Sequence, residues 1–154
     1  VVEDGMVVTS FTLVNADADT DLFELVDGAI INLSDPQING TNLNIRANTS
    51  GPVDSVVFGF NSNVNFWTEN MAPYAIGKDN NGNYQPFNNI QTPGVYTIVA
   101  TPYSDGNGTG TAGTGLTITI TVVDGTANTG DVLPAPLTLP AITTEGCRCE
   151  PINR

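Results

Sequence analysis

Carboxylates are the side chains of this sequence best suited to chemistry, because it holds 16 aspartates and glutamates, four lysines and arginines, and no histidine. Without histidine, neither a Ser/His/Asp triad nor a Cys/His pair can form. Two carboxylates can hydrolyse a glycosidic bond, and the best available pair is Glu69 with Asp79, across a cleft made by an irregular segment. Glu69 is also well suited to a structural ion pair with Arg46. We favour the ion pair and predict that the protein is not an enzyme.

Aspartates at every second position between Asn15 and Asp21 could line a cation site. An EF-hand loop needs Gly at its sixth place and Glu at its twelfth, whereas this sequence has Leu22 and Gly28 there. A hydrated turn is therefore the favoured interpretation. If a cation binds, carboxylate oxygens predict calcium. Its ligands would come from one of two sets: Asp17, Asp19 and Asp21, or Asp79 and Asp105.

Four aromatic residues could bind a sugar, because exposed rings stack on sugar faces while Asn and Asp side chains bind the hydroxyl groups. The candidates are Trp67, Tyr74, Tyr84 and Tyr103. The alternative for Trp67 and for Tyr74 is a place in the core, since the sequence has few aromatic residues to spare. For each of these two alone, the core is favoured.

Charge and hydropathy exclude two kinds of partner. Four basic residues in a chain of net charge −12 cannot neutralise a polyanion, so nucleic acid is excluded. No run approaches the roughly 18 apolar residues of a membrane helix, so we expect no membrane insertion. An acidic surface that is poor in lysine is typical of a secreted protein, and we expect an extracellular location.

The elements that must position these residues are β-strands, organised around one hairpin. From Leu116 to Val122, apolar residues alternate with threonines, which is the period of a half-buried strand. The partner run from Val95 to Tyr103 is rich in β-branched and aromatic residues, and a loop of small polar residues joins the two runs. The residues expected in the core are Phe58, Phe60, Ile98, Leu116, Ile118 and Ile120.

Shorter strands are expected before this hairpin. Met6 to Val14 predicts an edge strand, and the pieces on either side of a turn at Asp27 and Gly28 predict two further edge strands that complete the first sheet. Leu43 to Asn48 predicts an interior strand, and Val53 to Asn61 a strand that pairs with it.

The irregular segment from Asn61 to Gly94 has no clean period, and such stretches are often functional or tightly packed. Within it we expect a short strand at Met71 to Ile76 and a turn at Asp79 to Asn83. Tyr96, directly after this segment, is placed as in the tyrosine corner of a β-sandwich, where the hydroxyl binds upstream backbone. A simple strand aromatic is the equal alternative.

Three strings carry a resemblance to a known family: LNIRANTSGPVDSVVFGF (Leu43 to Phe60), TENMAPYAIGKDNNGNY (Thr68 to Tyr84), and the hairpin from Gly94 to Asp124. They resemble an immunoglobulin-like or fibronectin-like β-sandwich module that recurs in large secreted and cell-surface proteins of aquatic bacteria and microalgae. The resemblance implies an all-β, antiparallel Greek-key sandwich over residues 1–124, with extracellular accessory or architectural work. It carries over no catalytic residue.

Residues 125–154 lie outside the resemblance. Their prolines favour an extended course, yet the segment is more apolar than a free linker needs, so we expect a tail that docks on a neighbouring subunit or module. Cysteines one residue apart can bond to each other only in a strained ring, which favours partners outside the chain in an oxidising compartment. The alternative is that the tail begins a next module, in which its cysteines pair. The assembly residues are Leu133, Leu137, Leu139, Ile142, Cys147 and Cys149.

These observations predict a non-catalytic structural subunit or module of an extracellular filament, surface or adhesive protein, which associates with itself or with neighbouring modules through its tail. The alternative is a carbohydrate-binding accessory module of a secreted protein, with a glycan as its partner.

Overall fold

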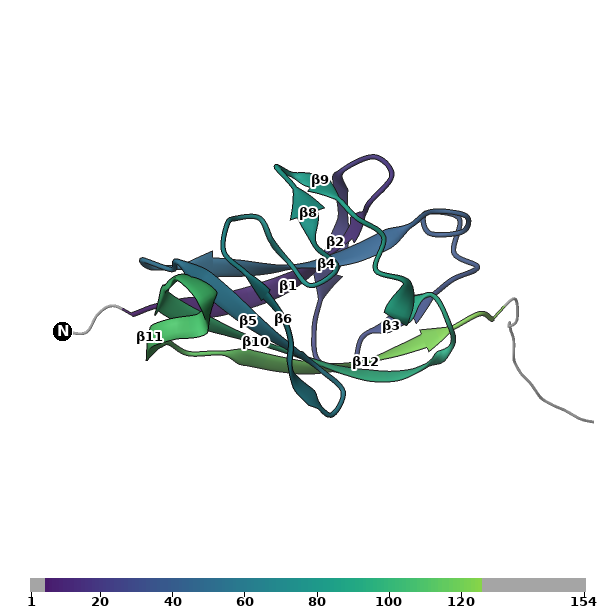
Figure 1. Ribbon diagram of the computed structural model, residues 1–154. Coiled ribbons are helices and arrows are strands. Elements are labelled where there is room, and N and C mark those ends of the chain that lie inside the picture. The colour runs from purple at the N-terminus through teal and green to yellow at the C-terminus, as the bar shows by residue number, and fades with distance from the viewer. Residues whose placement is uncertain (1–4, 126–154) are drawn as a thin grey trace, which may run out of the picture. The chain divides into compact units, whose positions relative to one another are not determined.

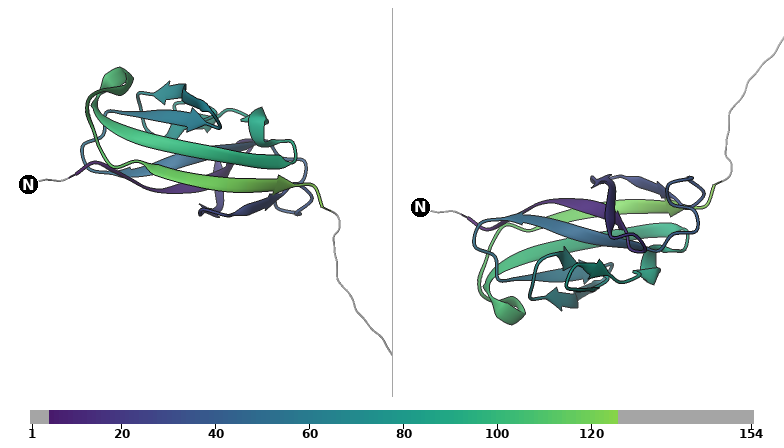
Figure 2. Two further views of the ribbon diagram at one scale, coloured as in Figure 1. Left: turned by 90° about the horizontal axis from the view of Figure 1, so that it is seen from below. Right: turned by 90° about the horizontal axis from the view of Figure 1, so that it is seen from above.

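The computed structural model describes residues 5–125, which are predominantly β and are arranged in two layers of strands (Figures 1 and 2). The organising hairpin is present as predicted: β10 (Gly94–Asp105) pairs antiparallel with β12 (Leu116–Val123). Ile98, Ile118 and Ile120 are buried, while Leu116 at the start of β12 is half-buried. The alternating pattern therefore placed this strand correctly, with its threonines on the outer face.

The hairpin lies in a six-stranded sheet of order β3–β12–β10–β5–β6, with β11 pairing on β10. Its other members are β3 (Ile30–Asn32), β5 (Ser55–Phe60), β6 (Asn63–Glu69) and β11 (Thr109–Ala112). The β3–β12 pair is parallel and the other pairs are antiparallel. The loop between β10 and β12, which we expected to hold no element, contains β11 and the 3-10 turn η2 (Gly106–Gly108).

A second sheet has the order β2–β1–β4–β7. Its strands are β1 (Val7–Asn15), β2 (Thr20–Leu25), β4 (Leu43–Ser50) and β7 (Tyr74–Ala75). The prediction that the first strand lies at an edge is wrong, because β2 and β4 flank it on both sides. The prediction of an interior strand from Leu43 is confirmed.

Two sheet assignments made from the sequence are also wrong. The pieces beside Asp27 and Gly28 lie in different sheets, because the turn between them binds β12: Thr119 N donates to Asp27 Oδ1 at 2.8 Å, and Gly28 N donates to Thr119 O at 2.7 Å. The strand after Val53 pairs with β10 and β6 and not with β4. Alternation reports which face of a strand is buried, but it does not report which sheet the strand joins.

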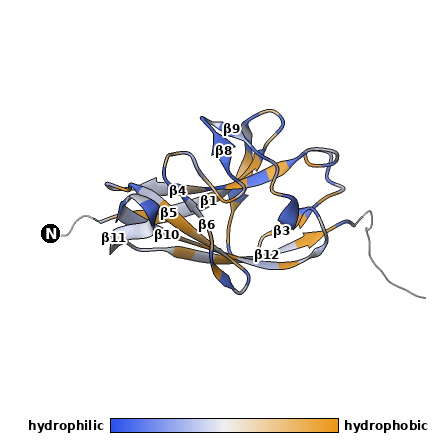
Figure 3. Cartoon of the chain, viewed as in Figure 1, coloured by the Kyte–Doolittle hydropathy of each residue, from blue (hydrophilic) through white to orange (hydrophobic). Residues whose placement is uncertain are grey.

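The core forms where the two layers meet. Phe11, Leu13 and Ile45 of the four-stranded sheet are fully buried in one cluster with Phe58 and Ile98 of the six-stranded sheet. Phe60, expected in the core, is 8% exposed and stacks on Tyr96 with ring centroids 5.5 Å apart. Hydrophobic residues lie on strands such as β5 and β12, whereas β8 is hydrophilic (Figure 3). No helix among residues 5–125 is long and apolar enough to cross a membrane.

The irregular segment contains more structure than its sequence predicted. It holds β6, β7, the small hairpin of β8 (Asp79–Asn80) and β9 (Asn83–Tyr84), and the 3-10 turn η1 (Asn88–Ile90). The turn predicted at Asp79 to Asn83 is the β8–β9 hairpin and is confirmed. Directly after the segment, Tyr96 Oη donates a hydrogen bond to Thr92 O at 2.7 Å, so the expected bond from Tyr96 to upstream backbone is also confirmed.

Candidate functional site

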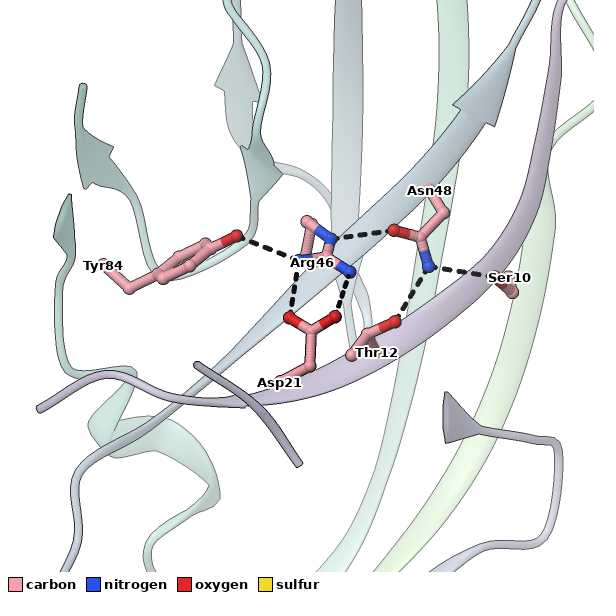
Figure 4. Close-up of polar contacts among 6 residues, drawn as sticks. All are labelled: Ser10, Thr12, Asp21, Arg46, Asn48 and Tyr84. Carbon is pink, nitrogen blue, oxygen red and sulfur yellow. Dashed lines mark hydrogen bonds and ion pairs between the residues drawn. The ribbon is translucent and has the colours of Figure 1, made fainter. Parts of the chain in front are cut away.

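Arg46, near the middle of β4, forms an ion pair with Asp21 of β2 and not with Glu69 (Figure 4). Its Nη1 and Nη2 donate to the two carboxylate oxygens of Asp21 at 2.8 and 3.0 Å, and Nη1 also donates to Tyr84 Oη at 3.2 Å. The predicted Arg46–Glu69 pair is wrong because β4 and β6 belong to different sheets. The hydrogen bonds from Arg46 lower the pKa of the Asp21 carboxyl group, and the same bonds raise the pKa of Arg46.

The side-chain amide of Asn48 extends this network. Arg46 Nε donates to Asn48 Oδ1 at 2.8 Å, and Asn48 Nδ2 donates to Ser10 Oγ and Thr12 Oγ1, both at 2.9 Å. The network therefore ties β1, β2, β4 and β9 together on one face of the four-stranded sheet. Because the guanidinium is bound on several sides by protein groups, the network is a structural tie.

Three of the candidate calcium ligands accept hydrogen bonds from nitrogen atoms of the protein. Asp17 accepts hydrogen bonds from the backbone and side-chain nitrogens of Asn42, each at 2.8 Å, and these bonds lower its pKa. Asp19 Oδ1 accepts from Tyr84 N at 2.8 Å, and Asp79 Oδ2 accepts from Gly82 N at 2.6 Å.

Within residues 5–125, no three His, Cys, Asp or Glu side chains gather into a group that could hold a metal ion. Asp105, the remaining candidate, is the last residue of β10. The set Asp17, Asp19 and Asp21 therefore does not form a group of three that could hold a metal ion.

Two of the four candidate sugar-binding aromatics are buried. Tyr74 and Tyr84 are 8% and 7% exposed, so neither ring offers a platform to solvent. This agrees with the core position favoured for Tyr74, whereas Tyr84 is wrong as a sugar-binding candidate. Tyr74 Oη donates to Val53 O at 2.9 Å, while Tyr84 Oη accepts from Arg46. Tyr103 on β10 and Trp67 on β6 are half-buried.

A cleft lies beside Trp67, and we name it the Lys78 cleft. Its volume is about 450 Å³. Strand β6, the chain after β7 and the chain around η1 line it, through Phe66, Ile76, Gly77, Lys78, Gln85, Pro86, Phe87, Asn88 and Asn89. Lys78 Nζ lies 4.4 Å from the centroid of the Trp67 ring, which is cation–π distance. The Lys78 side chain therefore lies over the Trp67 ring and forms part of the cleft wall.

Buried Asn44 of β4 fixes this wall. Its Nδ2 donates to Lys78 O at 2.9 Å and to Gln85 O at 2.7 Å, and its Oδ1 accepts from Gly77 N at 2.8 Å. A Cβ at Gly77 would lie 2.6 Å from Phe87 Cβ and 2.7 Å from Asn44 Oδ1, so glycine is required there. One amide from the core thus holds both sides of the β8–β9 hairpin.

A smaller cavity of about 140 Å³ is lined by Glu69 and Asp79 together with Met71, Ala72, Asn80 and Asn81. The prediction that Glu69 and Asp79 meet at a cleft is confirmed. Burial raises the pKa of Glu69 and the charge of Asp79 raises it further, whereas a hydrogen bond from Trp67 Nε1 at 3.3 Å lowers it. Carboxylates and amides in this cavity offer acceptors and donors to a polar ligand.

No family model matches the sequence, and no curated protein or solved structure is significantly similar to it. The candidate assembly residues of the tail, from Leu133 to Cys149, lie outside the described residues. Sequence reasoning missed Asn44, Lys78 and the amides near η1 as site residues. The one available signal was that Lys78 is the only lysine in a strongly acidic sequence.

Proposed function

We propose that the chain contains an immunoglobulin-like Greek-key module that serves as a non-catalytic structural unit of an extracellular assembly. The strand order supports the immunoglobulin-like assignment, because the chain alternates between two sheets and β3 joins β12 in parallel. The hydrogen bond from Tyr96 to Thr92 supports it too, since it has the form of a tyrosine corner.

The observation that carries the structural role is the placement of the two ends of the module. Near the start of β1, Val8 N donates to Thr114 O and Thr114 N donates to Met6 O, each at 2.9 Å. The chain then runs along the 8 residues of β12, roughly 25 Å at about 3.3 Å per residue, to Val123.

The first strand thus starts, and the last strand finishes, at opposite ends of the layers (Figure 2). This placement suits modules joined in series, because each can connect to the next without the chain turning back.

The sequence of residues 125–154 also supports the proposed assembly. An extended, proline-interrupted segment cannot donate every backbone hydrogen bond, so it suits an edge or a groove of a neighbouring copy. Leu133, Leu137, Leu139 and Ile142 would pack on that copy, and Cys147 and Cys149 would cross-link it in an oxidising compartment.

Size-exclusion chromatography with light scattering tests this assembly over a series of concentrations. We expect the full chain to self-associate and a chain that ends at residue 125 to stay monomeric. A full chain with Cys147→Ser and Cys149→Ser serves as the control that separates tail packing from cross-linking. A full chain that stays monomeric at every concentration, with a single monomer band in non-reducing electrophoresis, would overturn the proposal.

A further inference from the structure

The Lys78 cleft has the size and lining of a ligand site that the structural role does not use. Small-molecule sites have volumes of about 300–1,000 Å³ and combine apolar walls with a few polar groups, and the cleft has about 450 Å³. Phe66, Pro86 and Phe87 provide its apolar surface, while Gln85, Asn88 and Asn89 provide amides.

The polar groups of the cleft have unused hydrogen-bonding capacity. Lys78 forms no ion pair with any carboxylate of residues 5–125, although the sequence has net charge −12. Asn88 and Asn89 are exposed, and their side chains make no hydrogen bond within the described residues. An ammonium group donates hydrogen bonds, and each amide both donates and accepts.

The wall of the Lys78 cleft is preformed, because hydrogen bonds within the protein fix its backbone. Fully buried Asn44 binds the backbone on both sides of the β8–β9 hairpin, and Phe87 N donates to Leu43 O at 2.7 Å. Binding to such a wall orders few additional groups, which lowers the entropic cost of association.

The chemistry of these groups selects the ligand. Among the described residues, Lys78 is the only charged one that lines the cleft, Asp79 follows it directly, and the net charge of −12 repels anionic ligands. Sugar hydroxyl groups donate and accept hydrogen bonds, and the C–H faces of a pyranose pack on apolar and aromatic surface. We propose that the Lys78 cleft binds a neutral oligosaccharide, with Lys78, Asn88 and Asn89 at its hydroxyl groups and Phe66 and Pro86 against its ring face.

Titration of the full chain with neutral hexasaccharides of glucose, mannose and N-acetylglucosamine, followed by calorimetry and by NMR, tests this proposal. A hexasaccharide of uronic acid forms the charged arm. We expect one of the neutral hexasaccharides to bind, and Asn88→Ala with Asn89→Ala to weaken it about tenfold through the loss of two hydrogen bonds. Lys78→Asn, a residue that tolerates the positive φ of 75° at this position, should also weaken it.

Asn65→Ala is the matched control, because Asn65 is an exposed asparagine of β6 outside the cleft, and it should leave binding unchanged. A melting curve for each variant separates lost binding from lost folding. The proposal is overturned if no neutral hexasaccharide binds at millimolar concentration, if the double variant binds like the wild type, or if the uronate binds in preference. Self-association through the tail has a separate readout, so either proposal can fail without the other.

Discussion

The β10–β12 hairpin and the irregular segment of residues 61–93 are held in place by different forces. In the hairpin, Ile98, Ile118 and Ile120 repeat the same buried apolar contact along a regular ladder. In the irregular segment after β6, strands of two residues alternate with turns, and Ile76, Phe87 and Ile90 are buried. There the buried amide of Asn44 binds the backbone on both sides of the β8–β9 hairpin.

The hairpin therefore mainly stabilises the fold, whereas Asn44 mainly positions the wall of the Lys78 cleft. Burial of many apolar groups is spread over the ladder and gives most of the free energy of folding. A single buried amide gives less free energy, but it fixes the position of a wall that carries exposed polar groups, as a binding site needs. The predictions below test whether the two regions respond to substitution in these two ways.

The largest effect is expected in the hairpin. Ile118→Ala removes buried methyl groups and leaves a cavity, which should lower the free energy of unfolding by about 2–4 kcal/mol. Chemical denaturation measures this change. Thr117→Ala, at the neighbouring exposed position, should change it by no more than about 0.5 kcal/mol. Equal effects of the two substitutions would contradict the assigned faces of β12.

The next effect is expected at the buried amide. Asn44→Ala leaves the carbonyl groups of Lys78 and Gln85 and the N–H of Gly77 without their partner, at a cost of about 2–3 kcal/mol. Asn65→Ala, on the exposed part of β6, is the control and should be close to neutral. A neutral Asn44→Ala variant in the same denaturation experiment would show that the wall does not depend on this amide.

A smaller effect is expected where the two regions join. Tyr96→Phe removes the donor to Thr92 O while keeping the ring against Phe60, and should cost about 1 kcal/mol. Tyr103→Phe is matched to it, because the Tyr103 hydroxyl makes no hydrogen bond within the described residues. If the two variants have the same midpoint, the bond to Thr92 contributes nothing to stability.

The smallest effects concern pH, and they have opposite signs. Hydrogen bonds from Arg46 lower the pKa of Asp21, so this group stabilises the protein above its ordinary pKa of about 3.9 and loses that contribution as pH falls. Burial raises the pKa of Glu69, so the folded protein favours the protonated carboxyl group. The stability that this group contributes is present below its ordinary pKa of about 4.3 and declines as pH rises above it.

Denaturation from about pH 3 to about pH 7 compares Asp21→Asn and Glu69→Gln with the wild type. Each effect should be at most about 1 kcal/mol, since the Asp21 side chain is 57% exposed and solvent screens the pair. Equal pH dependence in all three proteins would argue against both shifts.

The two regions also differ in how well the sequence predicts them. The hairpin was predictable because a period of two is local information, and so was the turn at Asp79, where Asn and Gly favour a hairpin. The partner of Arg46 was not predictable, because it depends on which strand lies beside β4. The role of Asn44 was equally hidden, since Gly77, Lys78 and Gln85, whose backbone it binds, are more than 30 residues away. The core was the favoured position for both Trp67 and Tyr74. Tyr74 is buried in the core, whereas Trp67 is half-buried and packs against the core.

Amide hydrogen exchange on the full chain, with and without Asn44→Ala, tests most directly whether the two regions are held by different forces. The substitution should accelerate exchange in the irregular segment, first at Gly77 and at the amides of the β8–β9 hairpin, and leave Ile98, Ile118 and Ile120 unchanged. A uniform acceleration over both regions, or none in the irregular segment, would contradict the conclusion that one buried amide positions the cleft wall independently of the hairpin core.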